Sequence, residues 1–322
     1  LRKLSLITPF RLLSILRREK PDLIHTHGKG PGLYGRIIGR ILKIPVVHTF
    51  HGFHYEDLPF FTRVIHLAAD ILLTLVTAQH IFVSRGEKNR ARAIKLLDED
   101  NSTIICNGVD LEHIQNISFS RKTVLKSAEC DDWANKKILG TISRLSPEKG
   151  ILNLLSAFSI AIREVTDLRL IIVGGYPEEH KDYYMMAKEL ISKQNLTEHI
   201  RILGYRQDAL EILKCMDFYI SSSLSEGLPI SMLEACAAGI PTIATEITGN
   251  KDILSNSVFG VLTESGSPKS IGKGIIKMAR MKQEEREILT RNSLNRIKMH
   301  FSIEEMTNKT SLLYNQVLNA DT

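Results

Sequence analysis

The chain has 322 residues, of which 43% are hydrophobic, 24% charged and 6% aromatic. This is the composition of a globular protein long enough for two domains, and it excludes a disordered chain and a fibre. The formal net charge of +6 is unevenly placed: residues 1–107 hold 16 Lys and Arg against 9 Asp and Glu, and the remainder holds 26 against 27. A basic first part favours an anionic partner, which is a phosphate ligand, a membrane surface or nucleic acid, and a plain solvated surface is the alternative.

The four cysteines, Cys106, Cys130, Cys215 and Cys236, stand at none of the spacings typical of metal or redox sites. Scattered thiols of this kind are typical of a reducing compartment. We find no signal peptide, and polar residues interrupt the most apolar segment, 64–83, which is too short to span a bilayer. The sequence therefore predicts a cytoplasmic protein.

Helix and strand patterns alternate along the first 110 residues. Helical periodicity runs through 7–22, 33–44, 60–77 and 86–98. Short apolar runs predict strands at 22–27, 45–52, 80–84 and 103–110. This alternation predicts a parallel sheet with helices on both faces. A complete domain of this kind usually has about six strands, so either strands are missing from the front of this one or the natural chain is trimmed. The absent part would be ~60 residues, or two or three βα units.

The periodicity fails between 111 and 135, where Ser, Lys, Asp and Asn accumulate, and this composition predicts a linker. The alternation restarts at 136. Strands are predicted at 136–145, 168–175, 200–205, 218–223, 241–245 and 260–263. Helices are predicted at 151–164, 183–193, 208–214 and 229–238, and from 267 to the end. The second part of the chain therefore reads as a complete α/β domain.

The stretch SEGLPISMLEACAAGIPTIAT, residues 225–245, places a short helix directly after a strand that ends in serines. Pro229 suits the first turn of this helix, and Gly239 suits the position just after its last turn. Ligands bind beyond the carboxyl ends of parallel strands, so the start of the helix is expected to hold an anion such as a diphosphate. Glu226 and Glu234 would then accept hydrogen bonds from the hydroxyls of a sugar nucleotide, and a loop charge and a helix-surface charge are the alternative.

Two cations, Arg144 and Lys149, flank the turn after the first strand of the second domain. We expect both at the edge of the sheet where the helix at 229–238 begins. Arginine offers a planar fork to phosphate oxygens and lysine a point charge. Taken alone, each would more often be a surface cation, but together with the helix start they predict a diphosphate site.

The motif at 225–245 resembles the Glu-x7-Glu signature of the family 4 retaining glycosyltransferases, which have the two-domain GT-B fold. Five further segments are similar to parts of that family: GTISRLSPEKG, LIIVGGYPE, IRILGYRQD, ICNGVD and the final FSIEEMTNKTSLLYNQVL. The resemblance implies an α/β protein with two Rossmann-like domains facing a cleft. Its parts would be an incomplete acceptor-side domain at 1–110, a linker at 111–135, a donor-binding domain at 136–300 and a helix at 301–322 that crosses back to the first domain.

The resemblance also implies roles for single residues. Glu226 would contact the hydroxyls of the donor sugar, Glu234 the ribose, and Arg144 and Lys149 the diphosphate. The other donor-binding positions that it implies are Gly174, Tyr205, Arg206, Gly227, Leu228 and Pro229. Members of the family often carry a Gly-Gly turn after the motif, whereas this chain has TGNKD at 248–252, so contacts there differ.

Five of the 11 histidines cluster early in the chain: His25, His27, His48, His51 and His54. A metal site is one interpretation, but the spacings fit the ends of two parallel strands better, and no cysteine joins the cluster. The resemblance implies that His51 lies at the reacting centre and contacts the donor sugar. His27 and His54 are weaker candidates for that role.

Two other motifs allow different interpretations. GPGLYG at 30–35, with Asp57 about 20 residues further on, fits a dinucleotide fingerprint and would predict an NAD-dependent enzyme. Pro31 disfavours this interpretation, and the resemblance explains the glycines by close packing of a helix on a sheet. DED at 98–100 imitates a metal-binding D-x-D motif, but we expect a solvated loop, because the family's arrangement needs no metal.

We therefore expect a retaining glycosyltransferase that moves a sugar from a nucleotide-sugar to a hydroxyl of a glycan or lipid-linked acceptor, with no cofactor or metal. The expected process is the biosynthesis of bacterial surface polysaccharide, such as capsule or lipopolysaccharide. The basic helix with Leu12 and Leu16 would contact the anionic inner face of the plasma membrane peripherally. Nucleic acid is disfavoured, because the basic half has few aromatic residues. A non-catalytic sugar-nucleotide-binding remnant or partner subunit is the alternative.

Overall fold

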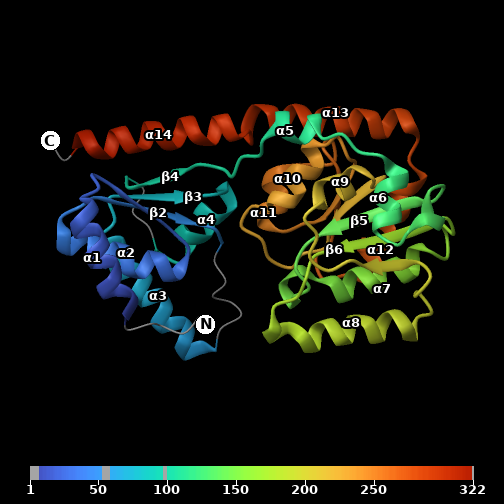
Figure 1. The fold of residues 1–322 in the computed structure, drawn as a ribbon, viewed down its shortest axis with the longest axis horizontal. Helices are drawn as coiled ribbons and strands as arrows, with labels where there is room; N and C mark the ends of the chain where they lie inside the picture. The colour runs from blue at the N-terminus through green and yellow to red at the C-terminus, as the bar shows by residue number, and fades with distance from the viewer. Residues whose placement is uncertain (1–6, 53–58, 97–99, 321–322) are drawn as a thin grey trace. The chain divides into compact units, whose positions relative to one another are not determined.

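A computed structural model describes residues 7–52, 59–96 and 100–320 of the chain (Figure 1). The chain forms two compact units: Leu1–Asn107 together with Glu304–Thr322, and Gly108–Ile303. Each unit is built around its own parallel sheet, which is the α/β architecture expected from the sequence.

The first unit contains a four-stranded sheet whose strands pair in chain order and in parallel. The strands are β1 (Ile24–His27), β2 (Val46–Phe50), β3 (Gln79–Phe82) and β4 (Ser102–Ile104). The helices of this part are α1 (Ile7–Glu19), α2 (Lys29–Leu42), α3 (Phe60–Thr74) and α4 (Arg85–Ala93). β2 is buried along its whole length, as an inner strand of a sheet covered on both faces should be.

α2 begins at Lys29, four residues earlier than predicted, so the glycines of GPGLYG lie inside the helix. A Cβ at Gly32 would collide with the ring of His48, and one at Gly35 would collide with Thr26. These glycines therefore let α2 lie directly on β1 and β2, and close helix–sheet packing explains them without a dinucleotide. Asp57, His54 and residues 98–99 of the DED motif lie outside the described residues.

The last helix, α14 (Ile303–Ala320), belongs mostly to the first unit. Its Leu313 and Val317 are buried against side chains of three strand regions of that unit. These partners are Val47, Ile81 and Ile105. The C-terminal helix α14 thus completes the hydrophobic core of the first unit.

The second unit contains a six-stranded parallel sheet with the strand order β10-β9-β8-β5-β6-β7. The strands are β5 (Lys137–Ile142), β6 (Leu168–Val173), β7 (Ile200–Ile202), β8 (Phe218–Ser221), β9 (Thr242–Thr245) and β10 (Val261–Thr263). The helices after β5 are α7 (Ile151–Ala161), α8 (Lys181–Lys193), α9 (Ala209–Lys214), α10 (Ile230–Ala237), α11 (Thr248–Leu254), α12 (Pro268–Arg280) and α13 (Gln283–His300), with 3-10 turns η2 (Pro147–Lys149) and η3 (Glu178–His180). The strand order reverses between β5 and β8, and such a switch point is where open α/β sheets bind ligands.

Residues 111–135, expected to form a linker, fold as part of the second unit. They form α5 (Leu111–Asn116), α6 (Arg121–Ser127) and the 3-10 turn η1 (Asp131–Trp133). Trp133 is fully buried, with the guanidinium of Arg201 5.0 Å from its ring. The ammonium of Lys214 donates hydrogen bonds to the carbonyls of Ile114 and Ile117 at the end of α5. Contacts with residues far along the chain therefore order a segment whose local composition is that of a loop.

Candidate active site

Two loops of the second unit meet at the switch point, one after β5 and one after β8. The hydroxyl of Ser222 donates to the carbonyl of Lys149 at 2.9 Å, and the amide of Leu224 donates to the carbonyl of Glu148 at 2.7 Å. Gly150 has a φ of 63° and lies against the carbonyl of Ser222, where a Cβ would not fit. The sequence thus brings the loop of the predicted cations and the loop of the predicted carboxylate into direct contact.

Lys149 and Glu226 form an ion pair at this contact. Lys149 Nζ lies 2.5 Å from Glu226 Oε1, and the two side chains are only 17% and 13% exposed. The same oxygen accepts a hydrogen bond from Ser223 Oγ at 2.7 Å. A charge-assisted bond in such a place is strong and keeps both groups in fixed positions. Sequence reasoning missed Ser223, although it is the last serine of FYISSS and therefore stands at the carboxyl end of β8.

Arg144, the second predicted cation, lies beside this pair in a more open place. Its side chain is 65% exposed, and Nη2 lies 3.4 Å from Glu148 Oε1. Ser146 Oγ donates to that carboxylate oxygen at 2.6 Å. Arg144 is therefore held loosely, and its guanidinium can turn toward a phosphate.

α10 begins beside Glu226, as predicted, but Pro229 is the residue before the helix rather than its first residue. Because proline has no side-chain oxygen, it leaves the N–H groups of the first turn uncapped and able to bind an anion. Gly227 and Leu228 are buried in the preceding loop. Gly249, at the start of α11, fits against this loop so closely that a Cβ there would lie 2.6 Å from the Gly227 carbonyl oxygen. The turn TGNKD thus supports the Glu226 loop from behind.

Glu234, the second carboxylate of the motif, lies half-buried in α10. Burial raises the pKa of its carboxyl above the usual value. A partly desolvated carboxylate gains stability from any hydroxyl that donates to it, so this environment suits a contact with a ribose.

The residues predicted at the nucleotide base lie after β6 and β7. The amide of Gly174 donates to the carbonyl of Gly204 at 2.8 Å, which brings the neighbouring Tyr205 beside Gly174. Tyr205 is 82% exposed and presents an open ring face. Arg206 is different: its guanidinium binds Asp208 through two nitrogens at 2.8 and 2.7 Å and also donates to the carbonyl of Ser127. Arg206 therefore ties α6 to the sheet.

His51, the remaining predicted catalytic residue, lies in the first unit, directly after β2. Its Nε2 is 2.9 Å from Nδ1 of His27, the last residue of β1. In the same cluster, His25 bonds Tyr314 of α14 through Nδ1 at 2.5 Å and Thr49 through Nε2 at 2.7 Å. The cluster therefore stands at the carboxyl ends of two strands, as predicted.

The histidines of this cluster are neutral near pH 7. Burial, followed by the nearby charges of His27 and His51, lowers the pKa of His25 to about 4. Burial also lowers the pKa of His27, and burial and His27 lower that of His51. Neutral imidazoles both donate and accept hydrogen bonds, so the cluster can bind uncharged hydroxyls. No group of three or more His, Cys, Asp or Glu within residues 7–52, 59–96 and 100–320 could hold a metal ion.

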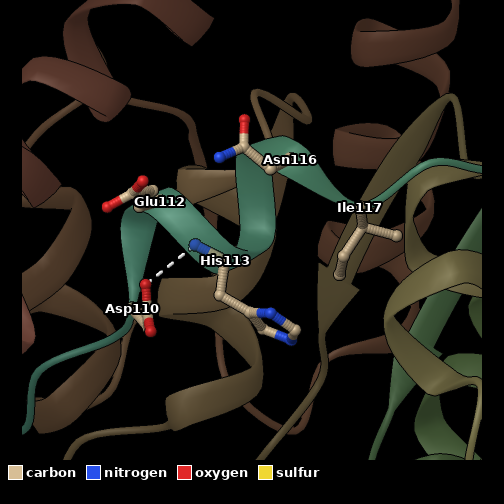
Figure 2. A pocket seen from close by; sticks show the side chains of 5 residues that line it. All are labelled: Asp110, Glu112, His113, Asn116 and Ile117. Carbon is tan, nitrogen blue, oxygen red and sulfur yellow. Dashed lines mark hydrogen bonds between the residues drawn. The ribbon is translucent and has the colours of Figure 1, made fainter.

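A hollow of about 450 Å³ lies along α5 (Figure 2). It is lined by Asp110, Glu112, His113, Asn116 and Ile117. Asp110 accepts the amide of His113 at 2.8 Å and so caps the helix. None of the predicted site residues lines this hollow, and the loops at the switch point remain the candidate site of the second unit.

Comparison with known families decides the class of this chain. The family described as "Glycosyl transferases group 1" matches residues 131–296, and the family described as "Glycosyltransferase Family 4" matches residues 1–113. The chain belongs to the group 1 glycosyl transferases. The match over 131–296 contains every predicted site residue of the second unit, and the match over 1–113 contains His51.

Curated proteins include relatives that match this glycosyltransferase over most of its length. The UDP-Gal:alpha-D-GlcNAc-diphosphoundecaprenol alpha-1,3-galactosyltransferase of Escherichia coli is 29% identical over 321 residues, which are 97% of this chain and 81% of the relative. The capsular polysaccharide biosynthesis glycosyltransferase CapM of Staphylococcus aureus is 21% identical over 317 residues, which are 96% of this chain and 80% of CapM.

Solved structures share the fold of this glycosyltransferase. Anabaena Alr3699/HepE in complex with UDP matches with a TM-score of 0.84 at 20% identity, over 96% of this chain and 82% of that chain. A glycosyltransferase from Rickettsia africae matches with a TM-score of 0.82 at 21% identity, over 97% and 81% of the two chains. The predicted GT-B fold is thereby confirmed.

Proposed function

We propose that this glycosyltransferase moves a sugar, with retention, from a nucleotide-sugar to a hydroxyl of a glycan or lipid-linked acceptor in the biosynthesis of bacterial surface polysaccharide. The observation that carries the proposal is the mostly buried Lys149–Glu226 pair at the switch point of the second unit's sheet, beside the uncapped start of α10. The Escherichia coli relative, whose name gives UDP-Gal and a diphosphoundecaprenol acceptor, and HepE with bound UDP support a UDP-sugar as the first donor to test.

The arrangement supports separate roles for the residues around the diphosphate. Negative charge develops on the leaving diphosphate as the bond from the sugar to the phosphate oxygen breaks. Lys149, Arg144 and the N–H groups at the start of α10 would stabilise that charge more in the transition state than in the bound donor. We assign no metal or other cofactor to this step.

The carboxylates and histidines have positioning roles in this proposal. Glu226, fixed by Lys149 and Ser223, would accept hydrogen bonds from hydroxyls of the donor sugar. Glu234 would accept from the ribose, and Tyr205 would stack on the base. His51 would contact the donor sugar as a neutral imidazole.

Release of free nucleotide from a panel of UDP- and GDP-sugars, with and without an undecaprenyl-diphosphate-sugar acceptor, tests the proposal. We expect turnover with one donor class and a loss of turnover in Glu226→Gln. The matched control is Glu189→Gln, because Glu189 forms a comparable pair with Lys193 at 2.7 Å on the exposed face of α8. Binding of a nucleotide-sugar without turnover would favour a non-catalytic partner subunit, and no binding of any member of the panel would contradict the proposal.

We further propose that the protein acts at the inner face of the plasma membrane, where a lipid-linked acceptor would be reached. Within the described ranges, none of the helices has the length and apolar character that crossing a bilayer requires.

A further inference from the structure

α3 of the first unit has an unusual distribution of side chains, because its outward side is apolar. Seven large apolar residues between positions 60 and 75 are exposed: Phe60, Phe61, Val64, Ile65, Ile71, Leu72 and Leu75. We call these seven residues the α3 apolar face. Phe61 and Leu75 are each 80% exposed. Single exposed apolar residues are ordinary, but seven on one helix mark a surface that water does not favour.

The inward side of α3 explains why the helix cannot turn this face into the core. Asp70 is buried and forms an ion pair with Arg36 of α2 at 2.8 Å. Arg36 is fully buried and also donates to the carbonyl of Gly32 at 2.9 Å. Leu73 is buried, and Leu67 packs against the core around Phe50 and Phe82. Rotating α3 would separate Asp70 from Arg36 and leave a buried charge without its partner, so the apolar face stays on the outward side.

Positions on the helix show that the face is one continuous stripe. At 100° per residue, the seven residues fall within about 140° of the helix circumference. The stripe is about 22 Å long, since 15 residues separate its ends and each adds 1.5 Å. α3 joins the carboxyl end of β2 to the amino end of β3, so the stripe starts at the sheet edge that carries His51.

Cations accompany the stripe at its far end. A hollow of about 510 Å³ lies between the ends of α2 and α3, and Arg40, Lys43, Leu75 and Val76 are among its lining residues. Ile41 of α2, next to Arg40 in the chain, is also exposed. Neither Arg40 nor Lys43 forms an ion pair within the described part of the chain. Apolar side chains beside unpaired cations are the composition of a surface that lies on an anionic bilayer.

The helix that the sequence indicated for membrane contact, α1, is a weaker candidate. Its Leu12 and Leu16 are half-buried, and α1 packs on α2. The expected apolar side is therefore partly covered, whereas that of α3 is open.

We propose that the α3 apolar face, together with Arg40 and Lys43, docks this glycosyltransferase on an anionic phospholipid bilayer. This inference deepens the proposed function, because docking along α3 brings the sheet edge with His51 to the lipid surface where a lipid-linked acceptor lies. The phenylalanine side chains enter the boundary between headgroups and acyl chains, and the two cations bind lipid phosphates.

Flotation of the whole chain with phosphatidylcholine vesicles, with and without phosphatidylglycerol, tests the proposal. We expect binding to the anionic vesicles and an affinity lower on the order of 100-fold in the variant Phe61→Ser/Ile65→Ser/Leu72→Ser. The matched control is Met185→Ser/Met186→Ser, which removes two exposed apolar side chains from α8 in the second unit. Reversal of charge in Arg40→Glu/Lys43→Glu should lower binding to the anionic vesicles by roughly tenfold or more.

Three results would overturn the proposal. The first is equal vesicle binding by the wild type and the triple variant, and the second is equal binding of the wild type to neutral and anionic vesicles. The third is a wild-type dimer that the triple variant makes monomeric while vesicle binding stays unchanged, because a second copy would then cover α3. Stabilisation by UDP-sugars, measured on the same variants, reports the donor site separately. Vesicle binding without any donor binding would contradict the proposed function and leave the docking surface intact.

Discussion

The two units place different chemistry at the carboxyl ends of similar parallel sheets. In the second unit the edge carries charges: the mostly buried pair of Lys149 and Glu226, beside the start of α10. In the first unit the edge carries His25, His27 and His51, which are neutral near pH 7 because burial lowers their pKa values. The same architecture therefore carries charged side chains at this edge in one unit and neutral imidazoles in the other.

The largest effect is expected from removing the cation of the charged edge. In Lys149→Met, kcat/KM should fall by on the order of 10²–10³, because a fixed charge no longer stabilises the leaving diphosphate. Nucleotide release under single-turnover and steady-state conditions measures this. Lys193→Met, which breaks a surface ion pair on α8, should leave kcat/KM unchanged. If Lys149→Met is as active as that control, the cation at the edge of the second unit does not stabilise the leaving diphosphate, and the two edges do not differ in this respect.

A smaller effect is expected from disturbing the support of that edge. In Gly249→Val, the new side chain meets the backbone of Glu226 and Gly227, so kcat/KM should fall by on the order of 10²-fold through misplacement of the carboxylate. Gly30→Ala is the control, since no atom lies within 4 Å of a Cβ there. If Gly249→Val keeps full activity with a normal melting temperature, the loop does not depend on this contact.

The buried histidines of the first unit should affect the pH dependence of stability. Burial, followed by the charge of Arg36, lowers the pKa of His48 to about 2, and burial lowers that of His25 and His80 to about 4 from an ordinary 6.5. Between these values the unfolded chain binds protons that the folded chain does not. Stability is therefore fully present above pH 6.5 and decreases as the pH falls from there toward 4.

Thermal unfolding followed by circular dichroism, from neutral pH down to about 5, measures this slope. His48→Gln should make the slope shallower, whereas the exposed His113→Gln of the second unit should not change it. An unchanged slope in His48→Gln would mean that protonation of the first unit's imidazoles does not limit stability.

The smallest effect is expected from metal removal. Because the leaving diphosphate is stabilised in our proposal by Lys149, Arg144 and the start of α10, activity should be the same with and without EDTA. Loss of activity in EDTA, restored by a divalent cation, would show that a metal ion also stabilises the leaving diphosphate. The charged edge of the second unit would then include the charge of that ion.

The sequence predicts much of this structure because its signals are local. β5 and β8 are apolar runs that end in serines or glycines, and Pro229 and Gly239 bound α10 within one or two residues of its true limits. Lys149 and Glu226 are 77 residues apart in the chain. The sequence placed both at one sheet edge, by the rule that ligands and loops gather at the carboxyl ends of parallel strands, but it did not predict that the two side chains pair.

Features that depend on distant partners could not be predicted. Trp133 is buried beneath Arg201, and Arg206 binds Ser127, so the segment 111–135 looks like a linker until both contacts are known. The helical period of 60–77 was clear, but only the pairing of Asp70 with Arg36 decides which side of α3 faces outward. Local composition predicts where helices and strands lie, whereas contacts between residues distant in the chain decide which segments are ordered and which side of a helix is buried.

Calorimetric titration of UDP and of a turnover-competent UDP-sugar into the wild type, Glu226→Gln and Lys149→Met tests the central claim most directly. We predict that Lys149→Met weakens both ligands, because both carry the diphosphate, and that Glu226→Gln weakens the UDP-sugar by about tenfold or more while UDP binds as before. Unchanged dissociation constants for both ligands in both variants would contradict the account.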